Sequence, residues 1–249
     1  KGFSRDRLLN LHGRLVRHIE RLSGIDWLHQ SELMYHYWMA GEKHKAAAYY
    51  GGDLTEGELF GATRVLTEAV IFGTGFEPNP GVTWVQGLVA ESQPALPVRL
   101  LLCQRCDSLL DETLAGDVPL AVRVALLTST RNALAELRRQ APDRAEYGRE
   151  WALCCLRLSD LHRDMGEPLQ AVEFCGEAAT ILEKISNNAG DPNVYSADLA
   201  ICQGMMGDLC LDMGRHSQAL VCYQTQKGII ENLRAGSGDE PDLARKLGI

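Results

Sequence analysis

Two pairs of aspartates recur in this chain at matching positions of a repeated segment. Residues 160–171 read DLHRDMGEPLQA and residues 208–219 read DLCLDMGRHSQA, with seven of twelve positions identical and an offset of 48 residues. Asp160 and Asp164 thus correspond to Asp208 and Asp212. On a helix, carboxylates at this spacing lie one turn apart and would attract a basic peptide or an N-terminal amine. They would also suit a solvated helix face, and Asp164 and Asp212 would also suit a helix end, so the sequence leaves these alternatives open.

A second group with suitable chemistry consists of His29, Glu32 and His36, which fall within two helical turns. Imidazole and carboxylate groups in such an arrangement are able to hold a metal ion. Helical spacing produces such clusters by chance, and the aromatic residues at positions 27, 35 and 38 favour packing. Cys103 and Cys106 form a CxxC pair without a second pair or matching histidines, inside a leucine-rich helical pattern. We therefore expect no metal.

Sequence signatures of nucleotide binding and nucleophilic catalysis are missing. No G-x4-G-K-[ST] motif occurs, and Gly73-Thr74-Gly75 lacks the third glycine and the strand-to-helix context of a dinucleotide site. No G-x-S-x-G elbow places a nucleophile beside a base. We therefore expect no cofactor and no enzymatic activity.

The elements that would position these groups are helices, because strand-like alternation is weak throughout the chain. Ser4 is a candidate N-cap, and Thr55 with Glu58 fits a capping box. Before the clear repeats, helices are predicted over about 4–22, 26–40, a segment ending at 50, 55–72, 82–91, 98–115 and 119–140, with a loop at 73–81.

The repeated segment itself predicts a helical hairpin. Gly166 and Gly214 follow a methionine where the chain must turn, and Ala171 and Ala219 let the second helix approach the first. Ser159 and Gly207 share one position, where a small residue suits a close crossing. A fainter copy lies at residues 39–46, MAGEKHKA, with the same spacing from glycine to alanine.

This pattern, L-[GS]-x-L followed by M-G-x4-A and a further Ala, resembles the tetratricopeptide repeat (TPR) family, in an extended form with longer linkers. The resemblance implies an all-α fold, a right-handed superhelical solenoid of helical hairpins. It implies an irregular helical array over residues 1–140, TPR-like in part at about 25–50. TPR-like repeats follow over residues 141–249, and the last of them is truncated.

In TPR-like arrays the first helix of each hairpin lines the concave face. The resemblance therefore implies a binding groove, in which the repeated aspartates form an acidic ladder and two arginines partly neutralise it. Its candidate residues are Arg157, Asp160, Arg163, Asp164, Met205, Asp208, Leu211 and Asp212.

A further resemblance concerns the opening of the chain, LHGRLVRHIER followed by WLHQSELMYHYWMAGEKHKAAAYY. It is similar to the helical region that follows the nucleotide-binding and winged-helix parts of STAND-type signalling ATPases and related transcription regulators. In those proteins such a stretch leads into TPR-type sensor repeats. The resemblance implies that this chain is the sensor part of a larger protein.

Charge and composition restrict the partners. The net charge is −8; residues 1–50 contribute eight Lys/Arg against five Asp/Glu, or +3, and the remainder contributes −11. An acidic body argues against nucleic acid as the main ligand. No run of 18 apolar residues predicts a membrane span, so no membrane partner is expected. Cysteines at apolar helical positions and the lack of a signal peptide favour the cytoplasm.

The sequence therefore predicts recognition of a protein or peptide, basic ones included, as the sensor or scaffold part of an intracellular signalling protein. The alternative is an effector-binding regulatory domain of a STAND-like ATPase or transcription regulator, which recognises a small molecule. We also expect Leu243 and Leu247 of the truncated repeat to be exposed, which would allow self-association.

Overall fold

The structure is a computed structural model, and it describes residues 4–73, 100–101, 103–105, 119–188 and 195–237. Within these ranges all regular secondary structure is α-helical, which confirms the all-α fold class. The chain divides into two compact units, Lys1–Ala133 and Leu134–Ile249. The division falls inside α7 (Leu120–Gln140), the helix predicted at about 119–140.

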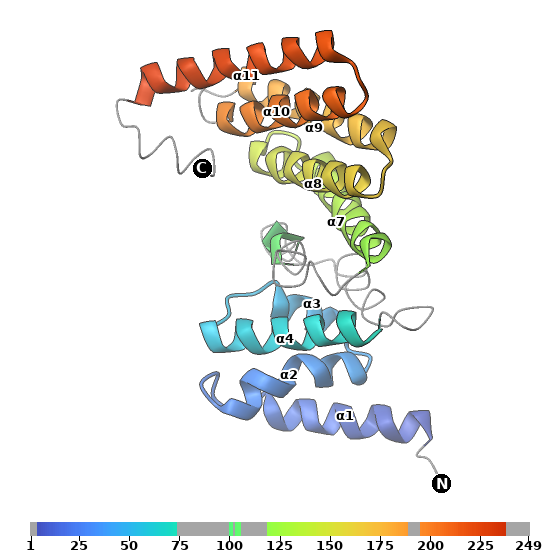
Figure 1. The fold of residues 1–249 in the computed structure, drawn as a ribbon. Helices are drawn as coiled ribbons and strands as arrows, with labels where there is room; N and C mark the ends of the chain where they lie inside the picture. Colours follow the sequence, from blue (N-terminus) through green and yellow to red (C-terminus); the bar gives the residue numbers. More distant parts are fainter. Residues whose placement is uncertain (1–3, 74–99, 102, 106–118, 189–194, 238–249) are drawn as a thin grey trace. The chain divides into compact units, whose positions relative to one another are not determined.

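The first unit is organised around α2, which packs against α1, α3 and α4 (Figure 1). Its core includes the fully buried side chains of Ile19, Leu33, Tyr50 and Leu66. The helices before α7 with full bounds are α1 (Arg5–Ile19), α2 (Trp27–Met39), α3 (Lys43–Tyr50) and α4 (Glu56–Gly73).

Local capping explains where two of these helices begin. Asp26 Oδ1 accepts a hydrogen bond of 2.9 Å from the Leu28 amide at the start of α2. The predicted capping box is confirmed, because Glu58 Oε2 accepts from the Thr55 amide at 2.9 Å and Thr55 Oγ1 accepts from the Glu58 amide at 3.3 Å. Ser4 occupies the N-cap position of α1, but its side chain makes no capping bond.

Two glycines bring α4 very close to α2. A Cβ atom added to Gly61 would lie 1.8 Å from the carbonyl oxygen of Gln30, a backbone atom that cannot move aside alone. A Cβ atom on Gly57 would lie 2.6 Å from the side chain of Gln30, which is able to rotate. The absence of a side chain at these two positions therefore sets the distance between α2 and α4.

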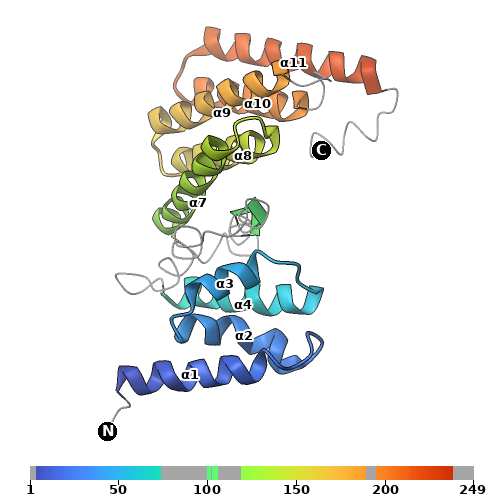
Figure 2. The ribbon, with the colours of Figure 1, turned by 180° about the vertical axis from the view of Figure 1, so that it is seen from behind.

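The second unit contains two consecutive helical hairpins. The first is α8 (Ala145–Asp164) with α9 (Pro168–Asn188), and the second is α10 (Ser196–Asp212) with α11 (His216–Ser237). α9 packs against both α8 and α10, so the hairpins lie side by side, as both ribbon views show (Figures 1 and 2).

The same turn joins the helices of three hairpins, α2–α3, α8–α9 and α10–α11. The glycine amide donates to the carbonyl three residues earlier, and the next amide donates to the carbonyl five residues earlier, at 2.7–2.9 Å. This pair of bonds is a Schellman motif, which requires a left-handed backbone that glycine adopts without strain. The three glycines are Gly41 (φ 76°), Gly166 (φ 74°) and Gly214 (φ 71°).

Small residues let the helices of each hairpin meet, as the sequence predicts. The alanine five residues after each turn glycine is fully buried or nearly so; these residues are Ala46, Ala171 and Ala219. Ser159 Oγ donates a 2.8 Å hydrogen bond to the Ala171 carbonyl across the first crossing. At the matching position a Cβ atom on Gly207 would lie 2.5 Å from the ring of Tyr223, so only glycine leaves room for that ring.

Cysteines in the described residues are free thiols, and most are packed in the core. Those that are buried are Cys103, Cys154, Cys155, Cys175, Cys202 and Cys210, whereas Cys222 is half-buried. The Sγ atoms of Cys175 and Cys202 lie 3.7 Å apart, and each thiol donates to the other residue's carbonyl oxygen at 3.4 Å. These cysteines pack as small hydrophobic residues, as expected for their helical positions.

Some predictions fall outside the described residues. They are the loop at 73–81 beyond Gly73, the helix at 82–91, most of the helix at 98–115, Cys106, and the truncated repeat with Leu243 and Leu247. Among the helices that the structure describes, none combines the length and the hydropathy needed to cross a membrane.

Candidate functional site

Two arginine–aspartate pairs connect α8 to α10. Arg149 donates from Nε and Nη2 to the Asp198 carboxylate at 2.6 and 3.0 Å. Fourteen residues later on both helices, Arg163 Nε donates to Asp212 Oδ2 at 2.7 Å. Both pairs join residues 49 positions apart, so α8 and α10 run in the same direction and in register. This register brings the repeated aspartates of the two helices onto one face.

The predicted acidic residues gather around Arg163 on this face. Its Nη1 lies 4.0 Å from Asp208 Oδ2, in addition to the bond with Asp212. Asp160 is exposed, yet the surrounding protein displaces enough water from its carboxylate to raise its pKa, and the negative charges of Asp164 and Asp208 act in the same direction. Because the side chain reaches solvent, the raised pKa of Asp160 corresponds to only a small change in the free energy of folding. We call Asp160, Arg163, Asp164, Asp208 and Asp212 the acidic cluster.

One member of the acidic cluster is held by α11, the second helix of the second hairpin. The Tyr223 hydroxyl donates to Asp208 Oδ1 at 2.5 Å. This hydrogen bond, with burial as a smaller cause, raises the pKa of Tyr223 to about 12. Tyr223 therefore fixes the Asp208 carboxylate in place.

The remaining predicted groove residues lie on the same two helices. Arg157 is exposed on α8, Met205 is half-buried on α10, and 45% of Leu211 is exposed. Leu211 directly precedes Asp212 and adds an apolar side chain to the exposed surface of α10.

The chemistry that the acidic cluster offers is electrostatic. Asp208 and Asp212 are held by Tyr223 and Arg163, whereas Asp160 and Asp164 make no ion pair within the described part of the chain. The acidic cluster contains four carboxylates and one guanidinium group, that of Arg163, so its net charge is −3. Such a surface suits an ammonium or guanidinium group from a partner.

Sequence reasoning missed two contacts that organise this face. It did not pair Arg149 with Asp198, whose side chain is only 9% exposed. The available signal was the repetition of Asp198-Leu-Ala at residues 242–244. It also did not connect Tyr223 with Asp208, to which the tyrosine hydroxyl donates a hydrogen bond.

The histidine group in α2 does not converge on a common point. His29 Nδ1 lies 3.2 Å from Glu58 Oε1 of α4, whereas His36 Nδ1 lies 2.8 Å from His12 Nδ1 of α1. Within the described ranges, no group of three or more His, Cys, Asp or Glu residues is arranged to hold a metal ion. His29 and His36 therefore serve two different helix contacts.

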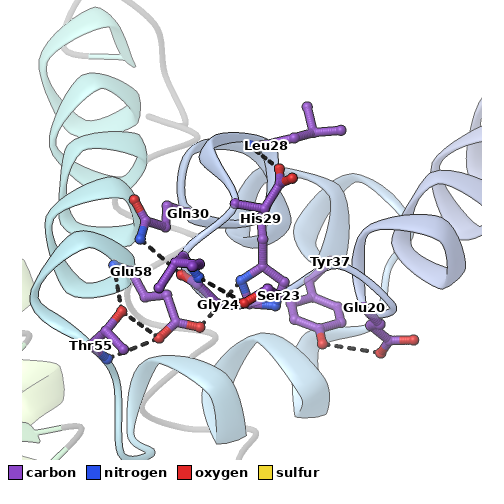
Figure 3. Close-up of polar contacts among 11 residues, drawn as sticks. Glu20, Ser23, Gly24, Leu28, His29, Gln30, Tyr37, Thr55 and Glu58 are labelled. Carbon is purple, nitrogen blue, oxygen red and sulfur yellow. Dashed lines mark hydrogen bonds and ion pairs between the residues drawn. The ribbon is translucent and has the colours of Figure 1, made fainter.

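A buried polar cluster surrounds Glu58, as Figure 3 shows. The Glu58 carboxylate lies between the Thr55 cap and His29, and Gln30 Nε2 donates to the Gly24 carbonyl at 2.8 Å. Nearby, the Tyr37 hydroxyl donates to Glu20 at 3.0 Å, and burial raises its pKa far above the ordinary value. The contacts of Glu58, His29 and Tyr37 join α1, α2 and α4, so we assign this cluster a structural role.

In comparisons with known proteins, no family model and no curated protein matched this chain.

Proposed function

We propose that this chain is a TPR-like helical-repeat module that recognises a protein or peptide carrying basic groups. In this proposal the hairpins form a right-handed solenoid, and α8 and α10 line its binding face. The module would act as the sensor or scaffold part of a larger intracellular signalling protein, in line with the resemblances of its sequence.

The recurrence of one hairpin supports the repeat architecture. Three hairpins share the Schellman turn with glycine and a buried alanine five residues later. In the second unit, consecutive hairpins pack through α9 and α10, and the first helices α8 and α10 are parallel. Stacked hairpins of this kind present extended surfaces that suit binding better than catalysis.

The observation that carries the binding proposal is the position of the repeated carboxylates. Asp164 and Asp212 are the last residues of α8 and α10, where the helix dipole disfavours a negative charge. The Schellman turns already end both helices, so the aspartates are not needed for that purpose. Asp160 lies one turn before Asp164, and its pKa is raised by burial and then by repulsion from Asp164, which a partner's cation would relieve.

The test is a peptide selection followed by affinity measurement on the full chain. Random displayed peptides should converge on sequences with Lys or Arg, and fluorescence anisotropy should show affinity that falls with added salt. The double variant Asp160→Asn, Asp164→Asn should bind the selected peptide roughly fivefold more weakly, since exposed ion pairs contribute up to about 1 kcal/mol in total. These two residues are chosen because Asp208 and Asp212 also hold Tyr223 and Arg163.

The matched control is Glu173→Gln, which removes an exposed carboxylate from α9 without altering the acidic cluster. This variant should bind the peptide as the parent chain does. Selected peptides without basic residues, or equal affinity for the double variant and the parent, would refute the proposal.

A second candidate function is the effector-binding regulatory domain, and a different observation favours it. The second unit contains a cavity of about 260 Å³ between the end of α7 and the hairpin α8–α9. Small-molecule sites begin at roughly this size, about 300 Å³. The cavity lies away from the acidic cluster and shares no residue with it.

A further inference from the structure

The cavity in the second unit is lined by cationic side chains and by no carboxylate. Its walls come from the last turns of α7, the turn to α8, the start of α8 and the end of α9. The cationic residues are Arg138, Arg139, Arg144 and Lys184, and the apolar walls include Pro142, Ile181 and Ile185.

The charges of these four side chains are only partly compensated. Arg139 pairs with Glu136 at 2.7 Å, and Arg144 pairs with Glu146 at 3.1 Å. Within the described part of the chain, Arg138 and Lys184 form no ion pair, so four cations and two counter-ions leave a charge of +2 at the cavity. This charge is opposite in sign to the net charge of the whole chain.

Arg138 is held in a position that suits anion binding. Its guanidinium group lies over the ring of Trp151, and the Cζ atom of Arg138 is 4.5 Å from the ring centroid. Stacking occupies the face of the guanidinium group and leaves its N–H donors at the edge. The Nη1 atom is buried and has no hydrogen-bond partner, which is costly for a charged group unless a ligand supplies the acceptor.

The start of α8 adds further positive potential. The N-cap residue is Arg144, and no side chain caps this helix end. Free amides at the start of a 20-residue helix favour an anion. Gly148 lies within the cavity lining, and its missing Cβ lets Ile185 approach, because an added Cβ atom would be 3.2 Å from that side chain.

We infer that this cavity binds a phosphomonoester, with the phosphate group at Arg138, Lys184 and the start of α8. A phosphate ester carries close to two negative charges at neutral pH, which matches the charge of +2. Arginine donates two parallel hydrogen bonds to phosphate oxygens. Ile181, Ile185 and Pro142 supply an apolar wall for the organic part of the ligand. The inference gives a ligand class to the second candidate function and is independent of the acidic cluster.

Isothermal titration calorimetry on the full chain at constant ionic strength tests this inference. The probes are phenyl phosphate, inorganic phosphate and succinate. We expect saturable binding of one phenyl phosphate per chain, weaker binding of inorganic phosphate, and little binding of succinate. Lys184→Gln and Arg138→Gln should each weaken phenyl phosphate binding roughly tenfold, since each removes a charge-assisted hydrogen bond. Amide resonances of Ala145 and Glu146 should shift on titration, because they lie at the uncapped start of α8.

The matched control is Lys227→Gln, which removes an exposed cation of α11 that pairs with Glu231. It should leave phenyl phosphate affinity unchanged. Lys184 is exposed, so its variant tests the inference even if loss of the Arg138–Trp151 contact unfolds the other variant. Absence of saturable binding, equal affinity in Lys184→Gln and the parent, or equal affinity for succinate would overturn the inference. Peptide binding to the acidic cluster should be unaffected by Lys184→Gln, so the two proposals fail or succeed separately.

Discussion

The hairpin α2–α3 of the first unit and the hairpins of the second unit share one turn but are stabilised in different ways. The turn glycines have nearly equal φ angles, 76°, 74° and 71°, and the same two hydrogen bonds. The second helices differ in length: α3 has 8 residues, whereas α9 and α11 have 21 and 22. A helix as short as α3 covers little of its partner, so another element must cover the rest of α2.

In the first unit α4 supplies that cover, and it approaches through glycine. Gly57 and Gly61 contact Gln30, and the buried Glu58 reaches His29. In the second unit the neighbouring hairpin supplies the cover. It packs through small residues in the core and through arginine–aspartate pairs at the surface. The hairpins therefore share a turn but not a packing partner, and the short second helix of α2–α3 coincides with cover by α4.

The largest expected effect is that of Gly61→Ala. The new methyl group would lie 1.8 Å from the Gln30 carbonyl oxygen, so α4 must move away from α2, at a cost of about 3 kcal/mol. Hydrogen exchange measured by mass spectrometry should show faster exchange in peptides from α2 and α4. Peptides from α8 to α11 should be unchanged, since they belong to the other unit.

The control for this prediction is Gly13→Ala in α1. No atom lies within 4 Å of the added Cβ, so the substitution should stabilise α1 by about 0.5–1 kcal/mol through helix propensity. Equal protection of α2 in the Gly61 and Gly13 variants would contradict the idea that glycine sets the α2–α4 distance.

An intermediate effect is expected from the two arginine–aspartate pairs of the second unit. Arg149→Met leaves the largely buried Asp198 carboxylate without its partner, which should cost about 2 kcal/mol. Arg163→Met removes a pair in which both side chains are more than 40% exposed, and it should cost about 0.5 kcal/mol. Hydrogen-exchange rates of the α10 amides, converted to free energies of opening, measure both costs. The same loss in both variants would show that burial does not distinguish the two pairs.

The parts of the fold that the sequence predicts are those determined locally. Gly166 and Gly214 signal their turns because few other residues adopt a left-handed backbone. Thr55 and Glu58 signal a cap because the bonds join residues three positions apart. The faint copy at residues 39–46 has the same turn for the same reason, although α3 is too short to complete an equivalent hairpin.

Contacts between distant segments were not predictable in this way. Gly61 reads as a weak helix residue until α2 is known to cross it, and Arg149 and Asp198 are joined only by the register of α8 and α10. For the candidate site, repetition indicated the aspartates, but it could not show that Tyr223 and Arg163 hold two of them. The cationic cavity was not foreseen, because its four cations come from two helices and a turn.

The smallest expected effect concerns pH and the contact of α1 with α2. His12 Nδ1 and His36 Nδ1 lie 2.8 Å apart, beside Tyr35. Burial, and then the positive charge on His12, lower the pKa of His36 below its ordinary value of 6.5, whereas Glu32 acts in the opposite direction. A lowered pKa in the folded state means that the unfolded chain binds the proton first, so this contact is weakened as the pH falls below about 6.5.

Hydrogen exchange of α1 and α2, corrected for the intrinsic effect of pH, should therefore rise a few-fold between neutral and mildly acidic solution. His36→Gln should abolish most of this dependence, because glutamine hydrogen-bonds to His12 without titrating. His44→Gln, at an exposed position of α3, should retain it. The acidic cluster responds in a pH range of its own, because the pKa of Asp160 is raised above the ordinary carboxyl value of 3.8. A pH response that is equal in α1 and α10, and unaltered by His36→Gln, would show that the histidine contact does not distinguish the two units.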